Sequence, residues 1–532
     1  MKSDPKSTIE TGNAILGIEF GSTRIKAVLI DQENKPIAQG SHSWENQLID
    51  GLWTYSIEAI WHGLQDCYAN LRANVKELYD TEIETLAAIG VSAMMHGYMV
   101  FNKKGEILVP FRTWRNTNTG QAAAALSELF VYNIPLRWSI SHLYQAILNN
   151  EKHVNEIDYL TTLAGFIHWQ ITGQKVLGIG DASGMLPIDS ATKNYSAEMV
   201  TKFDKLIASK EYGWKLTDIL PKVLQAGENA GLLTPEGAKR LDVSGHLKAG
   251  VQVCPPEGDA GTGMVATNAV KQRTGNVSAG TSSFSMIVLE KELSKPYEMI
   301  DMVTTPDGSL VAMVHCNNCT SDLNAWINLF KEYQELLGIP VDMNEIYGKL
   351  YNHALTGDTD CGGLISYNYI SGEPVTGLAD GRPLFIRSAN DKFNLANFMR
   401  AHLYASVGVL KIGNDILFNE EKIKVDRITG HGGLFKTKGV GQRILAAAIN
   451  SPISVMETAG EGGAWGIALL SSYLVNNRKK QSLPDFLDEY VFAGDAGIEV
   501  SPTAEDVAGF NTYIENYKAG LPVEEAATQF KK

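Results

Sequence analysis

The chain has 532 residues, 44% of them hydrophobic and 20% charged, and its formal net charge is −14. This length is too great for one hydrophobic core and predicts two large domains of a globular protein, while the negative charge argues against nonspecific binding to nucleic acid or an anionic membrane. No apolar stretch is long enough to span a bilayer, the first residues do not resemble a signal peptide, and five cysteines make no disulfide framework, so we expect a cytoplasmic protein.

The first predicted elements are the strands of a β-hairpin. Residues 15–20 and 25–30 are apolar and β-prone, and residues 21–23, Gly-Ser-Thr, have the composition of a tight turn between them. Residues 36–41 fit a third strand of the same sheet. Such a turn presents backbone N–H groups and hydroxyls at close range, as phosphate binding requires, although most turns of this composition are plain β-turns.

A helix and a buried strand follow. Apolar residues recur at three- and four-residue steps from Ile57 to Val75, so they share one face of a helix. Residues 86–92 are a short apolar run typical of a buried strand, and it ends in Met-His-Gly at 95–97. From about 120 to 252 the sequence mixes helices with polar loops, and its aromatic residues, Trp138 among them, are expected in the core.

The opening pattern returns in the middle of the chain. Residues 275–279 and 283–288 are strand candidates, and residues 280–282, Gly-Thr-Ser, form the turn between them. This second turn lies about half a chain length after the first. Two copies of strand, glycine-hydroxyl turn and strand indicate a duplicated fold with one hairpin in each lobe. If the lobes face each other, the two turns hold a triphosphate from opposite sides.

The C-terminal third contains a further nucleotide-like element. Residues 425–429 fit a strand that runs into Gly-His-Gly-Gly at 430–433, and a helix is expected from about 438 to 449. A second helix, roughly 463–475, is rich in small residues, which allow its backbone to lie close to a flat ligand or another helix. The sequence contains neither a Walker A loop nor a G-x-G-x-x-G between a strand and a helix, which disfavours P-loop and Rossmann folds.

One carboxylate is a candidate catalytic base. Asp259 lies in a glycine-rich bend, residues 257–263, whose small neighbours leave room for a sugar hydroxyl. Phosphoryl transfer from ATP requires positioning, Mg²⁺ and one group that accepts the hydroxyl proton, and a carboxylate between two lobes suits that last role. The alternative is an aspartate that caps a helix starting near Ala260.

Taken in order, these segments resemble the FGGY family of carbohydrate kinases over nearly the whole chain. The resemblance is carried by residues 18–23 (first phosphate hairpin), 95–97 (sugar segment of xylulokinases), 114–116, 180–184, 258–261 (catalytic-aspartate bend), 278–282 (second phosphate turn), and 430–433 with 461–466 (adenosine-binding end). It implies an α/β fold of two actin-like, ribonuclease H-like lobes with a central cleft. Residues 1–262 would form the sugar-binding N-terminal lobe and residues 263–532 the nucleotide-binding C-terminal lobe.

The resemblance also implies cofactors, partners and site residues. ATP and Mg²⁺ would be the cofactors, a small sugar the substrate, and Asp259 the base that takes the proton of its terminal hydroxyl. The implied substrate-binding residues are Met95, His96, Gly97, Trp114, Asn116 and Asp259. The implied ATP-binding residues are Gly21, Ser22, Thr23, Arg24, Gly280, Thr281, Ser282, Gly432 and Gly433. Glu19 and Asp259 would hold Mg²⁺ through water; no nucleic-acid or membrane partner is expected, and a homodimer is left open.

The expected substrate is a ketopentose, D-xylulose or L-ribulose. Met-His-Gly at 95–97 favours D-xylulose, whereas Arg115 beside Trp114 is similar to the arrangement in L-ribulokinases. The sequence departs from the family at Glu19 and Asn116, where aspartates are usual. The longer Glu19 side chain would shift the contact to Mg²⁺, and the uncharged amide of Asn116 leaves the exact sugar open.

Other interpretations stay open beside the leading one. The chain fits a kinase for another substrate of this family (glycerol, a hexulose or a deoxy-ketose), an actin-like ATPase that is no sugar kinase, or a sugar-binding protein without catalysis. His96 also fits a hydrogen-bonded histidine at a strand end. Cys316 and Cys319 form a C-x-x-C pair without a second pair at zinc spacing, which favours a structural role over a metal or redox site.

Overall fold

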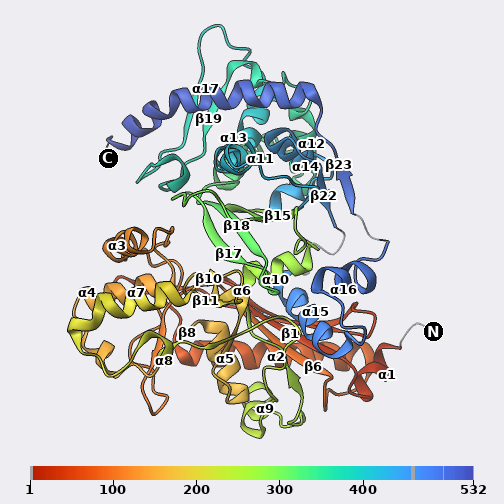
Figure 1. The fold of residues 1–532 in the computed structure, drawn as a ribbon. Coiled ribbons are helices and arrows are strands. Elements are labelled where there is room, and N and C mark those ends of the chain that lie inside the picture. Colours follow the sequence, from red (N-terminus) through yellow and green to blue (C-terminus); the bar gives the residue numbers. More distant parts are fainter. Residues whose placement is uncertain (1–3, 457–461, 495–496, 531–532) are drawn as a thin grey trace.

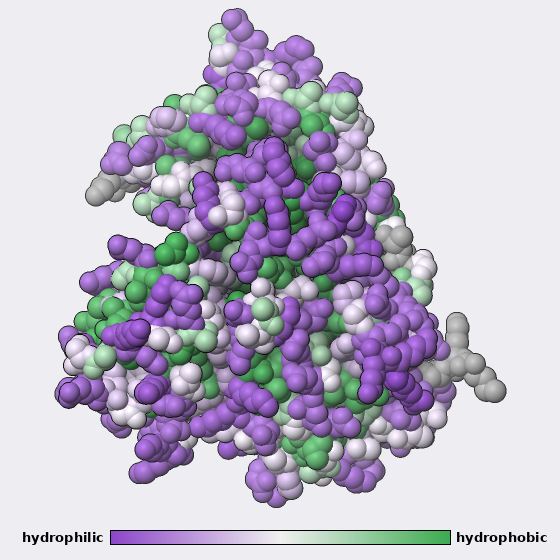
Figure 2. All heavy atoms as spheres, in the orientation of Figure 1, coloured by the Kyte–Doolittle hydropathy of each residue, from purple (hydrophilic) through white to green (hydrophobic). Residues whose placement is uncertain are grey.

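The computed structural model describes residues 4–456, 462–494 and 497–530, and these form two lobes, each with a mixed β-sheet covered by helices (Figure 1). An indentation separates the two lobes at the left edge of the view in Figure 2. Among the described residues, no helix combines the length and the apolar character needed to cross a membrane. Residue 461, part of the expected adenosine-binding end, lies outside the described residues.

The sheet of the first lobe has the order β13-β6-β1-β2-β3, with β14 also paired to β6. Its strands are β1 (Ile15–Phe20), β2 (Arg24–Ile30), β3 (Pro36–Ser43), β6 (Ala88–Ala93), β13 (Gln252–Val253) and β14 (Glu257–Gly258). β1 and β2 are antiparallel, and β6 runs parallel to β1. The turn at the end of β1 and the chain after β6 therefore leave the sheet at the same edge.

The sheet of the second lobe has the order β17-β18-β16-β15-β21-β22-β23. Its strands are β15 (Thr274–Ala279), β16 (Ser283–Val288), β17 (Asp301–Thr304), β18 (Leu310–Cys316), β21 (Arg427–His431), β22 (Ile453–Val455) and β23 (Ile498–Val500). β15 and β16 are antiparallel, and β21 runs parallel to β15. The order β18-β16-β15-β21-β22 repeats the order β3-β2-β1-β6-β13, which confirms the predicted duplication and the actin-like, two-lobed α/β fold.

Helices cover these sheets, and the remaining strands form two-stranded pairs. The helices are α1 (Pro5–Glu10), α2 (Ile57–Tyr79), α3 (Gly120–Phe130), α4 (Ser139–Leu148), α5 (Leu163–Thr172), α6 (Ile179–Ala182), α7 (Ala197–Ile207), α8 (Leu216–Ile219), α9 (Pro235–Leu241), α10 (Asp259–Ala266), α11 (Ser321–Leu336), α12 (Met343–Ala354), α13 (Leu395–Asp415), α14 (Val440–Ile449), α15 (Gly462–Asn476), α16 (Leu483–Tyr490) and α17 (Ala504–Thr528). The strand pairs are β4 (Gln47–Ile49) with β5 (Leu52–Thr54), β7 (Met99–Phe101) with β8 (Tyr159–Thr161), β9 (Val176–Gly178) with β12 (Lys222–Leu224), β10 (Ile188–Asp189) with β11 (Asn194–Tyr195), and β19 (Ile365–Tyr367) with β20 (Leu384–Ile386).

The long helix α2 shows why the sequence folds as it does locally. Its apolar positions recur at helical spacing and are buried against β3 and β2, as predicted. The Ser56 hydroxyl accepts a hydrogen bond from the backbone N–H of Ala59 (3.1 Å) and so satisfies one of the free donors at the start of the helix. At the other end Asp80 adopts a left-handed conformation (φ 47°) that terminates it.

The late helix α15 packs against the sheet of the first lobe, although it lies far along the chain (Figure 1). The small residues expected there make this approach feasible: a Cβ on Gly17 of β1 would lie 2.7 Å from the backbone nitrogen of Ala468. Trp465 donates its indole N–H to the carbonyl of Asn34 (3.0 Å). The expected domain boundary at 262/263 falls inside α10, and the chain then returns to the first lobe in α15.

Candidate active site

The first glycine-hydroxyl turn is fixed by three aromatic side chains. The backbone N–H of Gly21 donates to the carbonyl of Arg24 (2.9 Å), which closes the turn. The Gly21 carbonyl accepts from the indole N–H of Trp44 (2.7 Å), and the Ser22 carbonyl from the hydroxyl of Tyr55 (2.6 Å). The Ser22 hydroxyl accepts from the indole N–H of Trp114 (3.2 Å), so Trp114 supports this turn. Thr23 and Arg24 are exposed at its tip.

The second glycine-hydroxyl turn is braced by the chain that follows β18. The Gly280 N–H donates to the Ser282 carbonyl (2.9 Å). Thr320 donates to the Gly280 carbonyl from both its backbone N–H (3.0 Å) and its hydroxyl (2.8 Å). The Cys319 N–H donates to the carbonyl of Thr281 (3.0 Å). Both turns thus have anchored carbonyls, which leaves the backbone rigid while exposed Thr281 faces outward.

The segments after β6 and β21 occupy equivalent positions in the two sheets, and both have unusual backbone conformations. His96 has φ 68° and Gly97 φ 94°, and Gly432 has φ 101°. A Cβ on Gly97 would lie 2.8 Å from the Arg112 carbonyl, so glycine is required there. A histidine in the left-handed region is strained, and strained residues persist mainly where the surrounding structure and function fix them.

His96 is held on two sides. Its Nδ1 lies 3.2 Å from the carbonyl oxygen of Gly184, and its ring stacks on that of Trp138 with a centroid distance of 6.3 Å and an interplanar angle of 19°. Burial, and after it the Arg137 guanidinium, holds the pKa of His96 well below its usual value. His96 is therefore a neutral imidazole at physiological pH, and its other ring nitrogen is free of a partner among the described residues.

Asp259 begins helix α10 and lies beside the sugar segment. One of its carboxylate oxygens accepts the backbone N–H of Met95 at 3.2 Å, and its side chain is partly accessible. Gly258 precedes it as the N-cap, so Asp259 is the first residue of the helix and not the cap that the alternative interpretation expected; its side chain faces Met95 instead. Burial raises the pKa of Asp259 to about 6, which leaves it ionised but weakly basic at neutral pH.

We expect this pKa to govern the pH dependence of catalysis. Because the raised pKa means that Asp259 gains a proton as the pH falls through about 6, kcat/KM should be constant above pH 7 and fall about tenfold for each pH unit below 6. The measurement is kcat/KM between pH 5 and 8.5 with coupling enzymes in excess. A profile that stays flat down to pH 5 would contradict the role of Asp259 as base.

Three further acidic side chains lie around the bend that holds Asp259, and the Asp259 charge acts on two of them, Glu19 and Asp181. Burial, and after it the Asp259 charge, raises the pKa of Glu19 to about 7. Burial raises the pKa of Asp181 to about 7, and the Thr162 hydroxyl donates to its carboxylate at 2.6 Å. Glu257 accepts the backbone N–H groups of Gly180 (3.2 Å) and Asp181 (2.9 Å). Glu19 and Asp259 are close enough to repel each other, so a divalent cation between them would lower the energy of both ionised carboxylates.

The departure of Glu19 from the usual aspartate has a structural counterpart. Its carboxylate accepts the backbone N–H of Ala464 at 3.2 Å and so caps the start of α15. A Cβ on Gly463 would collide with this side chain, so the glycine makes room for it. The extra methylene of Glu19 therefore lets its carboxylate reach α15, the helix that packs on β1.

Shortening this side chain should loosen the contact between β1 and α15. In Glu19→Asp the carboxylate no longer reaches Ala464, and the lost hydrogen bond corresponds to about 1 kcal/mol of unfolding free energy. Because a chain of this length has a large unfolding entropy, we expect Tm to fall by only about 1 °C, measured by differential scanning calorimetry. Glu19→Gln is the matched control, because its amide oxygen still reaches Ala464. Equal Tm values for Glu19→Asp and the unchanged protein would show that this cap contributes nothing.

Of the other predicted sugar residues, some lie beside Asp259 and one is bound by the protein itself. Met95, His96 and Gly97 are buried beside Asp259. The amide of Asn116 is engaged by the protein itself: Oδ1 accepts the Trp53 N–H (2.9 Å), and Nδ2 donates to the carbonyls of Trp53 (2.8 Å) and Thr113 (3.0 Å). The Arg115 guanidinium lies 4.0 Å from the centroid of the Trp53 ring. Asn116 thus fixes the β5 segment and has no spare donor for a sugar.

Several residues that support the site were not singled out from the sequence. Trp138 was expected in the core and is fully buried, but it also forms the wall against which His96 stacks. Trp44 and Tyr55 hold the first turn from loops that carry no motif. Aromatic residues near a glycine-rich turn are too common for their spacing to have revealed these contacts.

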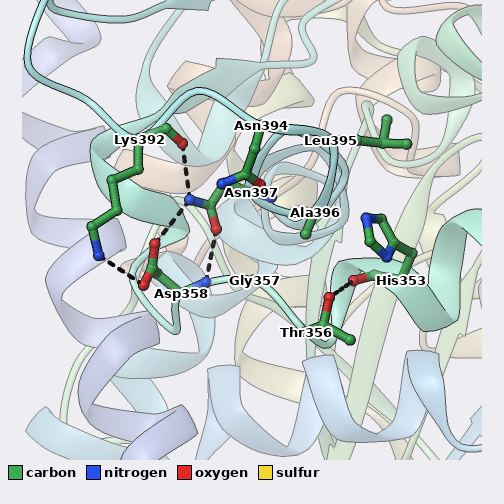
Figure 3. A pocket seen from close by; sticks show the side chains of 9 residues that line it. All are labelled: His353, Thr356, Gly357, Asp358, Lys392, Asn394, Leu395, Ala396 and Asn397. Carbon is green, nitrogen blue, oxygen red and sulfur yellow. Dashed lines mark hydrogen bonds and ion pairs between the residues drawn. The ribbon is translucent and has the colours of Figure 1, made fainter.

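Two features lie outside the cleft, a polar depression and the C-x-x-C pair. A polar depression between α12 and α13 includes Asp358, which accepts hydrogen bonds from Lys392 Nζ (3.0 Å) and Asn397 Nδ2 (2.9 Å), as Figure 3 shows. Cys316 and Cys319 are both buried, and burial raises the pKa of Cys319 to about 12. No cluster of three or more metal-ligating side chains occurs within residues 4–456, 462–494 and 497–530. The C-x-x-C pair is thus positioned as two buried small residues behind the second turn.

Comparisons with known proteins agree with this arrangement. The models of the FGGY family of carbohydrate kinases match at residues 14–264 for the N-terminal domain and 275–475 for the C-terminal domain. A xylulose kinase of Haemophilus influenzae is 22% identical over 525 residues, which cover 95% of this chain and 99% of that protein. An L-fuculokinase of Salmonella typhi is 22% identical over 52% of this chain and 56% of its own. The crystal structure of a gluconate kinase from Lactobacillus acidophilus has a TM-score of 0.79 and 17% identity over 98% of this chain and 100% of its own.

The two sheets with the same strand order define the class of actin-like ATPase folds. Within that class the chain belongs to the FGGY family of carbohydrate kinases, since its two family domains together cover most of the sequence. The relatives differ in the sugars that their names specify, so membership establishes the kinase class and leaves the sugar open.

Proposed function

We propose that the protein transfers the γ-phosphoryl group of ATP to the terminal hydroxyl of a ketopentose, giving the 5-phosphate and ADP. The observation that carries this proposal is the position of Asp259, whose carboxylate is bound to Met95 of the sugar segment and lies next to Glu19 of the first phosphate hairpin. A base in this position is adjacent to both substrates of a phosphoryl transfer.

In the proposed mechanism Asp259 accepts the proton of the attacking hydroxyl as the phosphoryl group arrives. Neutral His96 and the backbone around Gly97 hold the sugar, and Trp114 supports the first turn. ATP lies against Gly21, Ser22, Thr23 and Arg24 of the first lobe and against Gly280, Thr281, Ser282, Gly432 and Gly433 of the second. Glu19 and Asp259 fit Mg²⁺ held through water, because their charges repel each other without a cation, and Mg²⁺ when bound neutralises charge on the phosphates.

D-Xylulose is the preferred substrate of this proposal. His96 is held ready by Gly184 and Trp138, whereas Arg115, the residue that favours L-ribulose, is engaged with Trp53. The full-length similarity to a xylulose kinase supports the same choice. The alternatives are other substrates of the family, and the L-fuculokinase and gluconate kinase similarities make a deoxy-ketose and a sugar acid worth testing.

We also propose the domain division at 262/263. In this division helix α15 belongs to the C-terminal part of the chain but packs on the sheet of the first lobe.

A coupled ADP-release screen tests the function. The panel should contain D-xylulose, L-ribulose, glycerol, a hexulose, L-fuculose and gluconate, each with Mg²⁺ and ATP. We expect D-xylulose to give the highest kcat/KM, because a site shaped to hydrogen-bond one sugar rejects analogues that leave its donors unpaired. A higher kcat/KM with another compound would make that compound the proposed substrate in place of D-xylulose. ADP release that does not depend on any of these compounds would contradict the kinase proposal.

A further inference from the structure

The hairpin of β17 and β18 crosses from the second lobe onto the first. In Figure 1 it lies between the two lobes, directly beside α6. At its tip the Ala226 N–H donates to the Pro306 carbonyl (2.8 Å), and Thr304 donates from its N–H to the Ser183 hydroxyl (3.1 Å) and from its own hydroxyl to the Ile179 carbonyl (3.0 Å). The edge of one sheet is thus bonded to the other lobe.

Asp301, at the start of β17, is a charged contact between this hairpin and the first lobe. Its carboxylate forms an ion pair with the Arg137 guanidinium, and the two side chains are 11% and 20% exposed. The same carboxylate accepts the Nδ2 group of Asn133 (3.1 Å), which also donates to the Ile300 carbonyl (3.0 Å). The hydroxyl of Tyr132 donates to the carbonyl of Met302 (3.2 Å). One short segment of the first lobe, residues 132–137, is therefore held by β17.

This segment is also one of the two supports of His96. The Arg137 carbonyl accepts the Gly97 N–H (3.4 Å), and the next residue, Trp138, stacks on the His96 ring. The second support is the chain around Gly184, whose neighbour Ser183 is bonded to Thr304 of β17. Both walls of the His96 site are thus attached to the same strand of the opposite lobe.

The other end of the hairpin reaches the second phosphate turn. β18 pairs with β16 so that Cys316 lies opposite Ser283, the residue directly after the turn. Beyond Cys316, the backbone of Cys319 and Thr320 binds the turn itself. His315 of β18 is also affected by this segment: burial, and after it the Arg137 charge, lowers the pKa of His315 to about 3. A displacement of β17–β18 would therefore move both the His96 support and the phosphate turn.

We propose that Asp301 is a positioning residue for the sugar site: through Arg137 and Asn133 it holds residues 132–138 against His96 from the opposite lobe. It does not touch the reacting atoms. It makes the geometry of the sugar site depend on the position of the nucleotide lobe, so sugar and nucleotide bind better together than alone. This inference rests on the proposed kinase function.

The first test is Asp301→Asn, which keeps the acceptor for Asn133 and removes the charge opposite Arg137. We expect KM for the sugar to rise about tenfold while kcat changes less than threefold, because the chemical groups at Asp259 are unchanged. The affinity gain for a nonhydrolysable ATP analogue on adding sugar, measured by calorimetry, should fall toward one. Glu292→Gln is the matched control: it removes a charge at an exposed contact between the lobes, to the Ser190 hydroxyl (3.1 Å), and leaves the ion pair of Asp301 with Arg137 in place.

The second test is a double-mutant cycle with Arg137→Gln. If the two side chains act as a pair, the double variant should have a sugar KM no higher than the worse single variant. Should Asp301→Asn fail to fold, Arg137→Gln alone carries the same expectation. An unchanged sugar KM in both single variants, or multiplicative effects in the double variant, would overturn the inference. Failure of the unchanged protein to phosphorylate any sugar would instead defeat the proposed function.

Discussion

Asp259→Asn is expected to lower kcat about 10³-fold while KM for the sugar stays within about threefold. The asparagine oxygen still accepts the Met95 N–H, so the bend and the sugar segment keep their geometry. The amide has no basic oxygen at neutral pH, so the proton of the attacking hydroxyl has no acceptor when the phosphoryl group arrives. Initial rates of ADP release at saturating ATP, with sugar binding followed by calorimetry, measure both parts of the expectation.

The control for this variant is a chemically identical change far from the cleft. Asp80 ends α2 in a left-handed conformation that asparagine tolerates, and its side chain is 84% exposed. Asp80→Asn should keep kcat and KM. The residual activity of Asp259→Asn should not fall as the pH drops through 6, because the group that titrates there is gone. Sugar-dependent ADP release near the original rate would show that another group takes the proton.

Local patterns in the sequence were sufficient to predict the elements that form the site. The helix from Ile57 onward follows from apolar spacing, and the two glycine-hydroxyl turns follow from composition flanked by β-prone runs. Each depends on residues close together in the chain, where steric and hydrogen-bonding preferences act directly. The duplicated turn was one sign of two lobes, beside the chain length and the family resemblance, and the repeated strand order confirms the duplication.

Contacts between distant residues could not be predicted in the same way. Trp44 and Tyr55 brace the first turn, and Glu19 caps a helix that lies more than four hundred residues later. Nothing in the sequence around Glu19 indicates that its extra methylene is matched by a glycine at the start of α15. Likewise, Asn116 stands at the position where the family resemblance predicts a sugar contact, but the Trp53 backbone binds its amide. The sequence gives no sign that Trp53 lies beside it. Such pairings depend on tertiary packing rather than on local propensity.

Gly432→Ala is expected to raise KM for ATP at least tenfold and to lower thermal stability. Gly432 has φ 101° and ψ −174°, a region essentially confined to glycine, where another residue costs about 1–3 kcal/mol. A Cβ there would lie 2.5 Å from the carbonyl oxygen of Ala279, the last residue of β15 before the second phosphate turn. Relief of this clash requires β15 and β21 to separate at the point where the turn begins, which displaces Gly280 from the phosphates.

The neighbouring glycine provides the comparison that isolates this clash. A Cβ on Gly433 would reach the Ala279 oxygen only at 4.0 Å, an ordinary contact, and its φ is not positive. Gly433→Ala should therefore keep the Tm of the unchanged protein, whatever its effect on ATP. The Tm of both variants and the KM for ATP of Gly432→Ala, at saturating sugar, are the measurements. Because the sugar segment lies on the other lobe, KM for the sugar in Gly432→Ala should rise much less than KM for ATP. Equal increases in the two KM values would mean that the substitution disrupts the whole cleft instead of displacing the turn.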